Sequence, residues 1–118
     1  MRISSSESFA DYKTRVIDSK SASFCGAKWH GATIWLGHGQ TVSCHLPASH
    51  DIPLEELKGN PSAIHNTPHK KQMRKMMLEG DRPPECYKCW DTEDRGQLSE
   101  RVFKTGMYEE TDLDAIPL

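Results

Sequence analysis

The sequence predicts an α+β fold: a small metal-centred domain with one β-hairpin and several short helices. Three observations indicate it. The 118 residues suffice for one domain, but only 36% are hydrophobic and 27% are charged, so the apolar core is small for this length. Short helix-type and strand-type runs alternate with Gly and Pro. Four cysteines, which suit metal ligation, could supply the folding free energy that the core lacks.

Residues 1–23 are expected to form a partly helical N-terminal arm. The spacing of Phe9, Tyr12, Val16 and Ile17 places a small apolar stripe on one helix face. The remaining residues of this segment are rich in Ser and charge, which is equally typical of a partly ordered arm. The cluster-binding or metal-binding domain is expected over residues 24–105. Residues 106–118 form an acidic tail or linker in this division.

The hairpin is predicted between Ala32 and Cys44. Two β-rich runs there flank a Gly-His-Gly-Gln turn that includes Gly39. Cys25 would then lie just before the first strand and Cys44 on the returning strand. Trp35, in the middle of the first strand, is expected to pack in the core.

Helices are predicted after the hairpin. Pro53 begins one helical turn, and the Gly-Asn-Pro at residues 59–61 ends it. The clearest helix covers residues 68–79, with Asn66 or Thr67 as N-cap and Gly80 as its left-handed stop. Its methionines indicate a core face, and its basic residues are expected to be solvated: Met73, Met76 and Met77 on one side, and His69, Lys70, Lys71, Arg74 and Lys75 on the rest.

The C-terminal part of the domain begins with an extended approach to Cys86, because Pro83 and Pro84 disfavour helix in the residues before them. A further helix is expected over residues 91–103, interrupted near Gly96. Trp90 follows the second cysteine pair directly and is expected to shield the site from water.

The four cysteines fall into two pairs, Cys25 with Cys44 and the tight Cys-x-x-Cys of Cys86 and Cys89. Four thiolates can hold either zinc or an iron-sulfur cluster. Only one pair is tight, and the other spans a whole hairpin, which favours a wide cluster over one ion. His38 and His45, from the same region, are weaker candidates for ligands. Four cysteines already complete a tetrahedral set.

The N-terminus has no apolar run of signal-peptide type, and no stretch of about 18 apolar residues follows. A cytoplasmic protein without a membrane partner is therefore expected. In a reducing compartment, cysteines in this arrangement are more often metal ligands than disulfides, which would be the alternative for a secreted chain. The net charge of −2 makes a nucleic-acid partner unlikely by itself.

No catalytic machinery is evident in the sequence. A nucleophile with an adjacent base, a phosphate-cradling glycine loop and a spaced carboxylate pair are all missing. Three hypotheses remain: an iron-sulfur module, a zinc-stapled module that binds protein or RNA, and a domain of reduced thiols without metal.

The cysteine pattern resembles that of the SPASM and twitch domains, which hold auxiliary iron-sulfur clusters in radical SAM enzymes. Cys25, thirteen residues, Gly39, four residues and Cys44 match their opening signature, and Cys86-x-x-Cys89 matches the closing pair of the shorter twitch type. The resemblance covers about residues 24–105. The connecting text is also similar to the N-terminal region of twitch-containing radical SAM proteins at residues 59–66, 77–80 and 82–90.

The resemblance implies that Cys25, Cys44, Cys86 and Cys89 bind one [4Fe-4S] cluster, for electron transfer or substrate presentation. It further implies a partner, a radical SAM barrel protein or domain, and a possible peptide or other macromolecular substrate. The Cys-x-x-x-Cys-x-x-Cys motif that starts radical chemistry is missing from this sequence. The chain is therefore expected to be accessory, and not catalytic alone.

Overall fold

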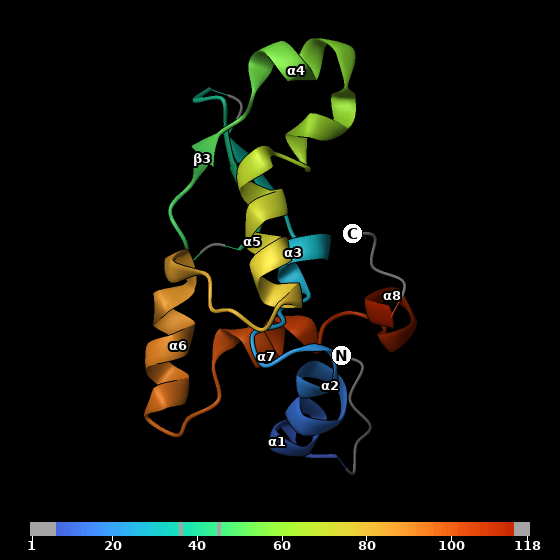
Figure 1. Cartoon of the computed structure of the whole chain (residues 1–118), viewed down its shortest axis with the longest axis vertical. Coiled ribbons are helices and arrows are strands. Elements are labelled where there is room, and N and C mark those ends of the chain that lie inside the picture. Colours follow the sequence, from blue (N-terminus) through green and yellow to red (C-terminus); the bar gives the residue numbers. More distant parts are fainter. Residues whose placement is uncertain (1–6, 36, 45, 115–118) are drawn as a thin grey trace.

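The computed structural model describes residues 7–35, 37–44 and 46–114. Its extents are 47 × 29 × 26 Å, and α5 lies between an end formed by α4 and the sheet and an end formed by α1, α2 and α7 (Figure 1). His45 lies outside the described residues. The elements in chain order are α1 (Phe9–Tyr12), η1 (Lys13–Ile17), α2 (Asp18–Lys20), α3 (Ala27–His30), β1 (Thr33–Trp35), β2 (Gln40–Val42), β3 (His50–Asp51), α4 (Leu54–Gly59), η2 (Pro61–Ile64), α5 (Pro68–Leu78), η3 (Pro84–Cys86), α6 (Tyr87–Asp94), α7 (Glu100–Thr105) and α8 (Glu110–Asp114).

The predicted hairpin is present, and the mixture of helices with an antiparallel sheet confirms the α+β class. β1 pairs with β2, with Thr33 opposite Val42, and Gly39 takes a φ of 63° in the turn. The expectation of a single hairpin was incomplete, because β3 adds a third strand in the order β1-β2-β3. The backbone N–H of Ile52 donates to the carbonyl of Gly39 at 2.8 Å and helps to hold β3 in place.

Trp35 corrects a second expectation. It is 41% exposed instead of packed in the core, since β1 is an edge strand whose described side chains all face solvent.

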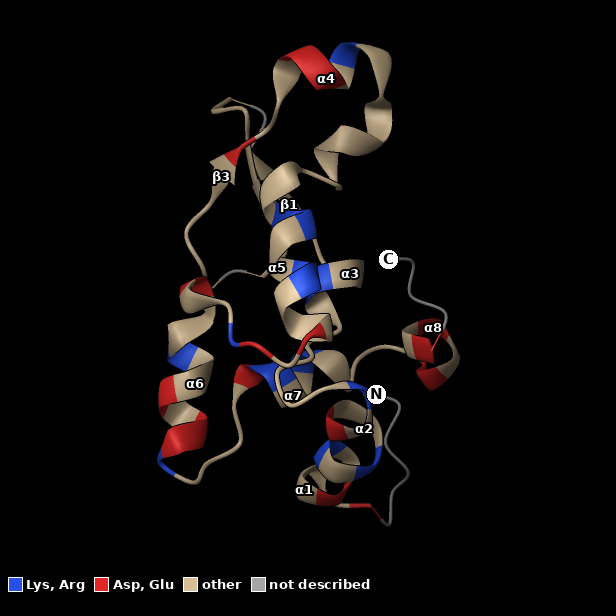
Figure 2. Cartoon of the chain, viewed as in Figure 1, with Lys and Arg blue, Asp and Glu red and all other residues tan. Residues whose placement is uncertain are grey.

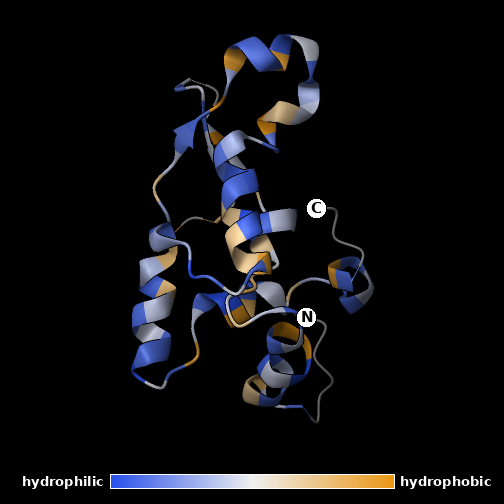
Figure 3. Ribbon diagram, viewed as in Figure 1, coloured by the Kyte–Doolittle hydropathy of each residue, from blue (hydrophilic) through white to orange (hydrophobic). Residues whose placement is uncertain are grey.

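The helical stripe predicted in the N-terminal arm is confirmed. The Ser8 hydroxyl accepts a hydrogen bond from the Asp11 N–H and caps α1, and the chain stays helical through η1 and α2. Tyr12, Val16 and Ile17 are buried in the main core, and Leu113 of α8 is buried in the same core. The core therefore draws on the arm, the middle and the acidic tail. Core residues come from α1, η1, α3, α5, α7 and α8, and Figure 3 shows hydrophobic segments on several of these helices.

α5 begins and ends as the sequence predicts. The Thr67 hydroxyl accepts a hydrogen bond from the Lys70 N–H at the N-cap, and Gly80 takes a φ of 82° after the last turn. Met73 and Met77 are buried. The prediction that the basic residues of this helix are solvated is wrong for two of them, because Lys70 and Arg74 are buried as well.

The remaining helices follow the Pro and Gly residues. Pro53 precedes α4 as its N-cap, one position earlier than expected. The extended approach to Cys86 ends in the short helix η3, and Gly96, with a φ of 81°, separates α6 from α7. Within the described ranges, no helix is both long and apolar enough to cross a membrane.

Candidate functional site

All four cysteines line one hollow of the molecule. Cys25 precedes α3, Cys44 follows β2, Cys86 ends η3 and Cys89 lies in the first turn of α6. All four are free thiols. The structure thus brings together four site residues from three distant segments. His38, the other histidine considered as a ligand, is exposed and does not line the hollow.

The hollow contains about 370 Å³ of space free of protein atoms, partly open to solvent. The space open to the centre of a water-sized sphere is only about 20 Å³, which is room for roughly one water molecule. Within the described residues, no three His, Cys, Asp or Glu side chains converge as the ligands of a single ion do. The thiols therefore surround the hollow without meeting at one point.

The remaining walls of the hollow are of two kinds. Apolar and aromatic side chains shield it from water, and three cations face the thiols. The shielding residues are Ala27, Leu46, Pro47, Met77 and Trp90, and the cations are Lys28, Arg101 and Lys104. Lys28 and Arg101 are each paired with a carboxylate, so their charge would only partly compensate a set of thiolates.

Cys25 is fixed by α7. The backbone N–H of Gly26 donates to the Thr105 hydroxyl at 3.0 Å, and the Arg101 guanidinium donates to the Phe24 carbonyl at 2.8 Å. Both neighbours of Cys25 are thereby hydrogen-bonded to one helix. A Cβ on Gly26 would lie 2.7 Å from Cδ2 of Leu113, so a larger residue here would require the Leu113 side chain to shift.

Cys44 is brought to α3 by a close backbone approach. A Cβ on Gly31 would lie 2.5 Å from the carbonyl oxygen of Ser43 and 3.0 Å from that of Ala27. Only a glycine permits this distance. Since Ser43 precedes Cys44 directly, Gly31 sets how near Cys44 lies to the Cys25 segment.

The second cysteine pair is held by its neighbours in sequence. The Trp90 indole N–H donates to the Pro83 carbonyl at 2.8 Å, which closes the turn around Cys86. The indole is buried, and the guanidinium groups of Arg82 and Arg101 lie 5.2 and 5.4 Å from its ring centroid. Trp90 lines the hollow, which is the position that shielding it from water would require.

A buried ion pair joins the two cysteine-bearing regions. Lys28, which follows Cys25 by three residues and is 3% exposed, donates to the carboxylate of Glu85, which precedes Cys86. His69 of α5 bonds the other oxygen of the same carboxylate. Burial alone would raise the pKa of Glu85, but the bonds from Lys28 and His69 outweigh it and the pKa is lowered. The pKa of Lys28 is raised because Cys86 and Glu85 outweigh its burial.

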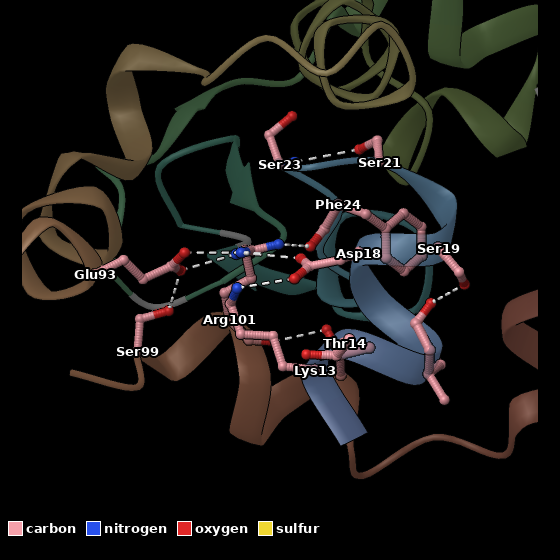
Figure 4. A network of polar contacts seen from close by, with 12 residues as sticks. Lys13, Thr14, Asp18, Ser19, Ser21, Ser23, Phe24, Glu93, Ser99 and Arg101 are labelled. Carbon is pink, nitrogen blue, oxygen red and sulfur yellow. Dashed lines mark hydrogen bonds and ion pairs between the residues drawn. The ribbon is translucent and has the colours of Figure 1, made fainter. Parts of the chain in front are cut away.

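A second buried ion pair, formed by Arg101 and Glu93, lies at the wall of the hollow. Arg101 is 2% exposed, and its guanidinium donates to both carboxylate oxygens of Glu93 at 2.8 and 2.7 Å. The Ser99 hydroxyl donates to Glu93 at 2.6 Å, and Asp18 lies 3.9 Å from Arg101 (Figure 4). This network connects α6, α7 and the residue before Cys25.

The thiols perturb one another. Burial raises the pKa of Cys25, and Cys44 and Cys89 add to the rise. Burial raises the pKa of Cys86 to about 12 although the Lys28 cation is near. Burial also raises the pKa of Cys89, with a contribution from Cys44. These thiols are neutral near pH 7, and metal binding would release their protons.

Sequence reasoning found the four cysteines and Trp90 but missed the residues that support them. Lys28, Glu85, Glu93 and Arg101 carry no local signal, because each ion pair joins separate segments. In the sequence, Gly31 is indistinguishable from a glycine that simply ends a helix, because it follows a helical turn. Its packing role depends on Ser43, twelve residues further along.

No family model, no curated protein and no solved structure matches this chain.

Proposed function

We propose that Cys25, Cys44, Cys86 and Cys89 hold one iron-sulfur cluster of the [4Fe-4S] type, and that the chain is an accessory module of a radical SAM system. The observation that carries the proposal is the convergence of all four cysteines on one hollow. The chain then works with a barrel protein or domain that cleaves S-adenosylmethionine, because its own sequence lacks the required cysteine motif.

The spacing of the thiols supports a cluster over the zinc alternative. A tetrahedral zinc with Zn–S bonds of about 2.3 Å holds its sulfurs about 3.8 Å apart. In the described part of the chain, no three His, Cys, Asp or Glu side chains are grouped as the ligands of a single ion are. A four-iron cluster is several ångströms wide, so thiols arranged around a hollow suit it better than they suit one ion.

Such a cluster supplies one-electron transfer, or a binding point for a substrate, when it is bound. The protein contributes its surroundings. Trp90, Met77 and Pro47 exclude water, and Lys28 and Arg101 place positive charge beside the thiolates. Positive charge near the sulfurs raises a reduction potential, and burial in apolar surroundings lowers it.

Metal and sulfide analysis tests the proposal. The chain is purified and reconstituted without oxygen, and iron, acid-labile sulfide and zinc are measured per chain. About four irons and four sulfides per chain are expected. No 5'-deoxyadenosine should form without a barrel protein. One zinc per chain without sulfide would support the zinc-stapled module instead.

Single Cys→Ser variants at the four positions should lose cluster absorbance and stability, because ligation contributes to folding. Met77→Leu is the matched control, since it changes a wall of the hollow without removing a thiol. Unchanged melting temperatures in all four Cys→Ser variants would instead identify a domain of reduced thiols without metal.

A further inference from the structure

All charged side chains of α5 are basic. It contains Lys70, Lys71, Arg74 and Lys75 and no Asp or Glu. These cations form two like-charged pairs four residues apart, an arrangement that destabilises a helix. Figure 2 shows basic turns along α5, whereas acidic residues lie on α1, α4, α6 and α8. The free protein therefore retains an unfavourable cluster of positive charge on this helix.

Within the part of the chain that the structure describes, the buried cations of α5 have no acidic partner. Arg74 is 9% exposed, and it donates to the Lys28 carbonyl at 2.7 Å, the Asn66 side-chain oxygen at 2.6 Å and the His65 carbonyl at 3.1 Å. Lys70 donates to the Thr41 hydroxyl at 2.9 Å. All acceptors are neutral. Burial lowers the pKa of Lys70 to about 8, and Arg74 contributes.

Lys71 and Lys75 are exposed, and their side chains have neither an ion pair nor a hydrogen bond with any described residue. Every Asp and Glu side chain of the sequence belongs to the described ranges. The contrast with the cysteine hollow is clear, since buried Lys28 and Arg101 there are each paired with a carboxylate. Among the described residues, the cations of α5 thus form no ion pair, and Glu79 is the one carboxylate that lines the same groove.

A groove of about 700 Å³ runs beside these cations. Lys71, Arg74 and Lys75 form its basic wall, and Leu78 and Trp29 add apolar surface. Ser62 and Asn66 lie on the opposite side, from η2 and the turn before α5. The bonds already described use three of the five N–H groups of Arg74.

We propose that this groove binds an acidic polypeptide segment. Its carboxylates would pair with Lys71, Lys75 and Arg74, and an apolar side chain between them would pack against Leu78. The complementary charge supplies specificity and fast association, and the apolar contact supplies buried area. Glu79 also lines the groove and would repel a carboxylate placed beside it. This repulsion would fix the direction in which the acidic segment lies.

An RNA strand fits the groove less well. Sequence-independent RNA binding needs exposed aromatic faces on which bases stack. The only aromatic side chain among the described residues that line the groove is Trp29, which is 5% exposed and is stacked on Phe24 with 5.1 Å between ring centroids. Its ring is not available to a base.

The groove is distinct from the cysteine hollow, and the two share no lining residue. The inference therefore goes beyond the proposed function and does not depend on which metal the cysteines hold. Failure of cluster reconstitution would leave it standing.

Fluorescence anisotropy of the full reconstituted chain tests the inference. The probe is a fluorescein-labelled dodecapeptide of repeated Glu-Glu-Leu, and the neutral comparison is the same peptide with Gln for Glu. The acidic peptide should bind, more weakly as salt increases, and the neutral peptide should bind at least about tenfold more weakly. A labelled oligouridylate of the same length is the nucleic-acid arm. Tighter binding of oligouridylate than of the acidic peptide would overturn the inference.

The decisive variant is Lys71→Glu with Lys75→Glu, which changes exposed side chains that have no ion pair or hydrogen bond with any described residue and should leave the fold intact. It should weaken binding of the acidic peptide about tenfold or more. Lys58→Glu with Arg95→Glu is the matched control, because it changes the net charge equally at exposed residues outside the groove. Retained binding by the groove variant, or an equal loss in the control, would refute the site.

Discussion

Replacement of Arg101 by Met should destabilise the protein more than any exposed ion-pair mutation. The side chain is 2% exposed and holds Glu93 by two hydrogen bonds and the Phe24 carbonyl by a third. Met preserves much of the apolar volume, so the loss is mainly electrostatic. Removal of one partner leaves a buried carboxylate without its cation, which costs about 3–5 kcal/mol.

The matched control is Arg82→Met. Arg82 also pairs with a carboxylate, that of Asp94 at 2.9 Å, but both side chains are about half exposed. An exposed pair contributes about 0–1 kcal/mol. Urea unfolding followed by tryptophan fluorescence, in protein kept reduced, should therefore separate the two variants by about 2–5 kcal/mol.

Two further variants test whether the unpaired charge of Glu93 causes the loss of stability. Adding Glu93→Gln to Arg101→Met removes the unpaired charge, so the double variant should regain part of the lost stability. Arg101→Lys should lie between the wild type and Arg101→Met, because an ammonium keeps the charge but not the planar fork. Equal midpoints for Arg101→Met and Arg82→Met would refute the reasoning.

Two further predictions concern packing and pH. Gly31→Ala should cost about 1–3 kcal/mol in urea unfolding and reduce metal content, because its Cβ would meet the Ser43 carbonyl at 2.5 Å. Gly37→Ala, which meets nothing within 4 Å, should be almost neutral, and an equal loss in both would contradict the packing role. Burial, with His69 and Lys70, lowers the pKa of His50 to about 4, so the unfolded chain binds the extra proton and stability falls as pH drops from about 6.5 to about 4. Allowing for partial exposure, the fall is about 2 kcal/mol, and His50→Phe should flatten the urea midpoints measured across this range.

Local rules predicted much of the fold. The cap at Thr67, the stop at Gly80 and the break at Gly96 depend on the backbone preferences of those residues, and all three are present. The stripe from Phe9 to Ile17 was predictable because helical spacing alone determines it. β3 was not, since two residues, His50 and Asp51, carry no strand pattern and pair only because β2 offers an edge.

The site divides in the same way. The grouping of its four thiols was predictable because their spacing, with one tight Cys-x-x-Cys pair, is typical of a shared site. The supporting pairs were not, since Lys28 and Glu85 are 57 residues apart and nothing in either segment specifies the other. A lysine or arginine on a helix is solvated by default, and only the tertiary fold shows that Lys70 and Arg74 are buried.

α5 connects the two candidate sites. Met77, on its buried side, forms part of the cysteine hollow, and Lys71 and Lys75 form a wall of the groove. Arg74 bonds the carbonyl of Lys28, and the side chain of Lys28 lines the hollow. An anion in the groove would hold Arg74 more firmly and so restrict the segment that follows Cys25. Because this path runs through one hydrogen bond, peptide binding and cluster properties can be coupled even though the sites share no residue.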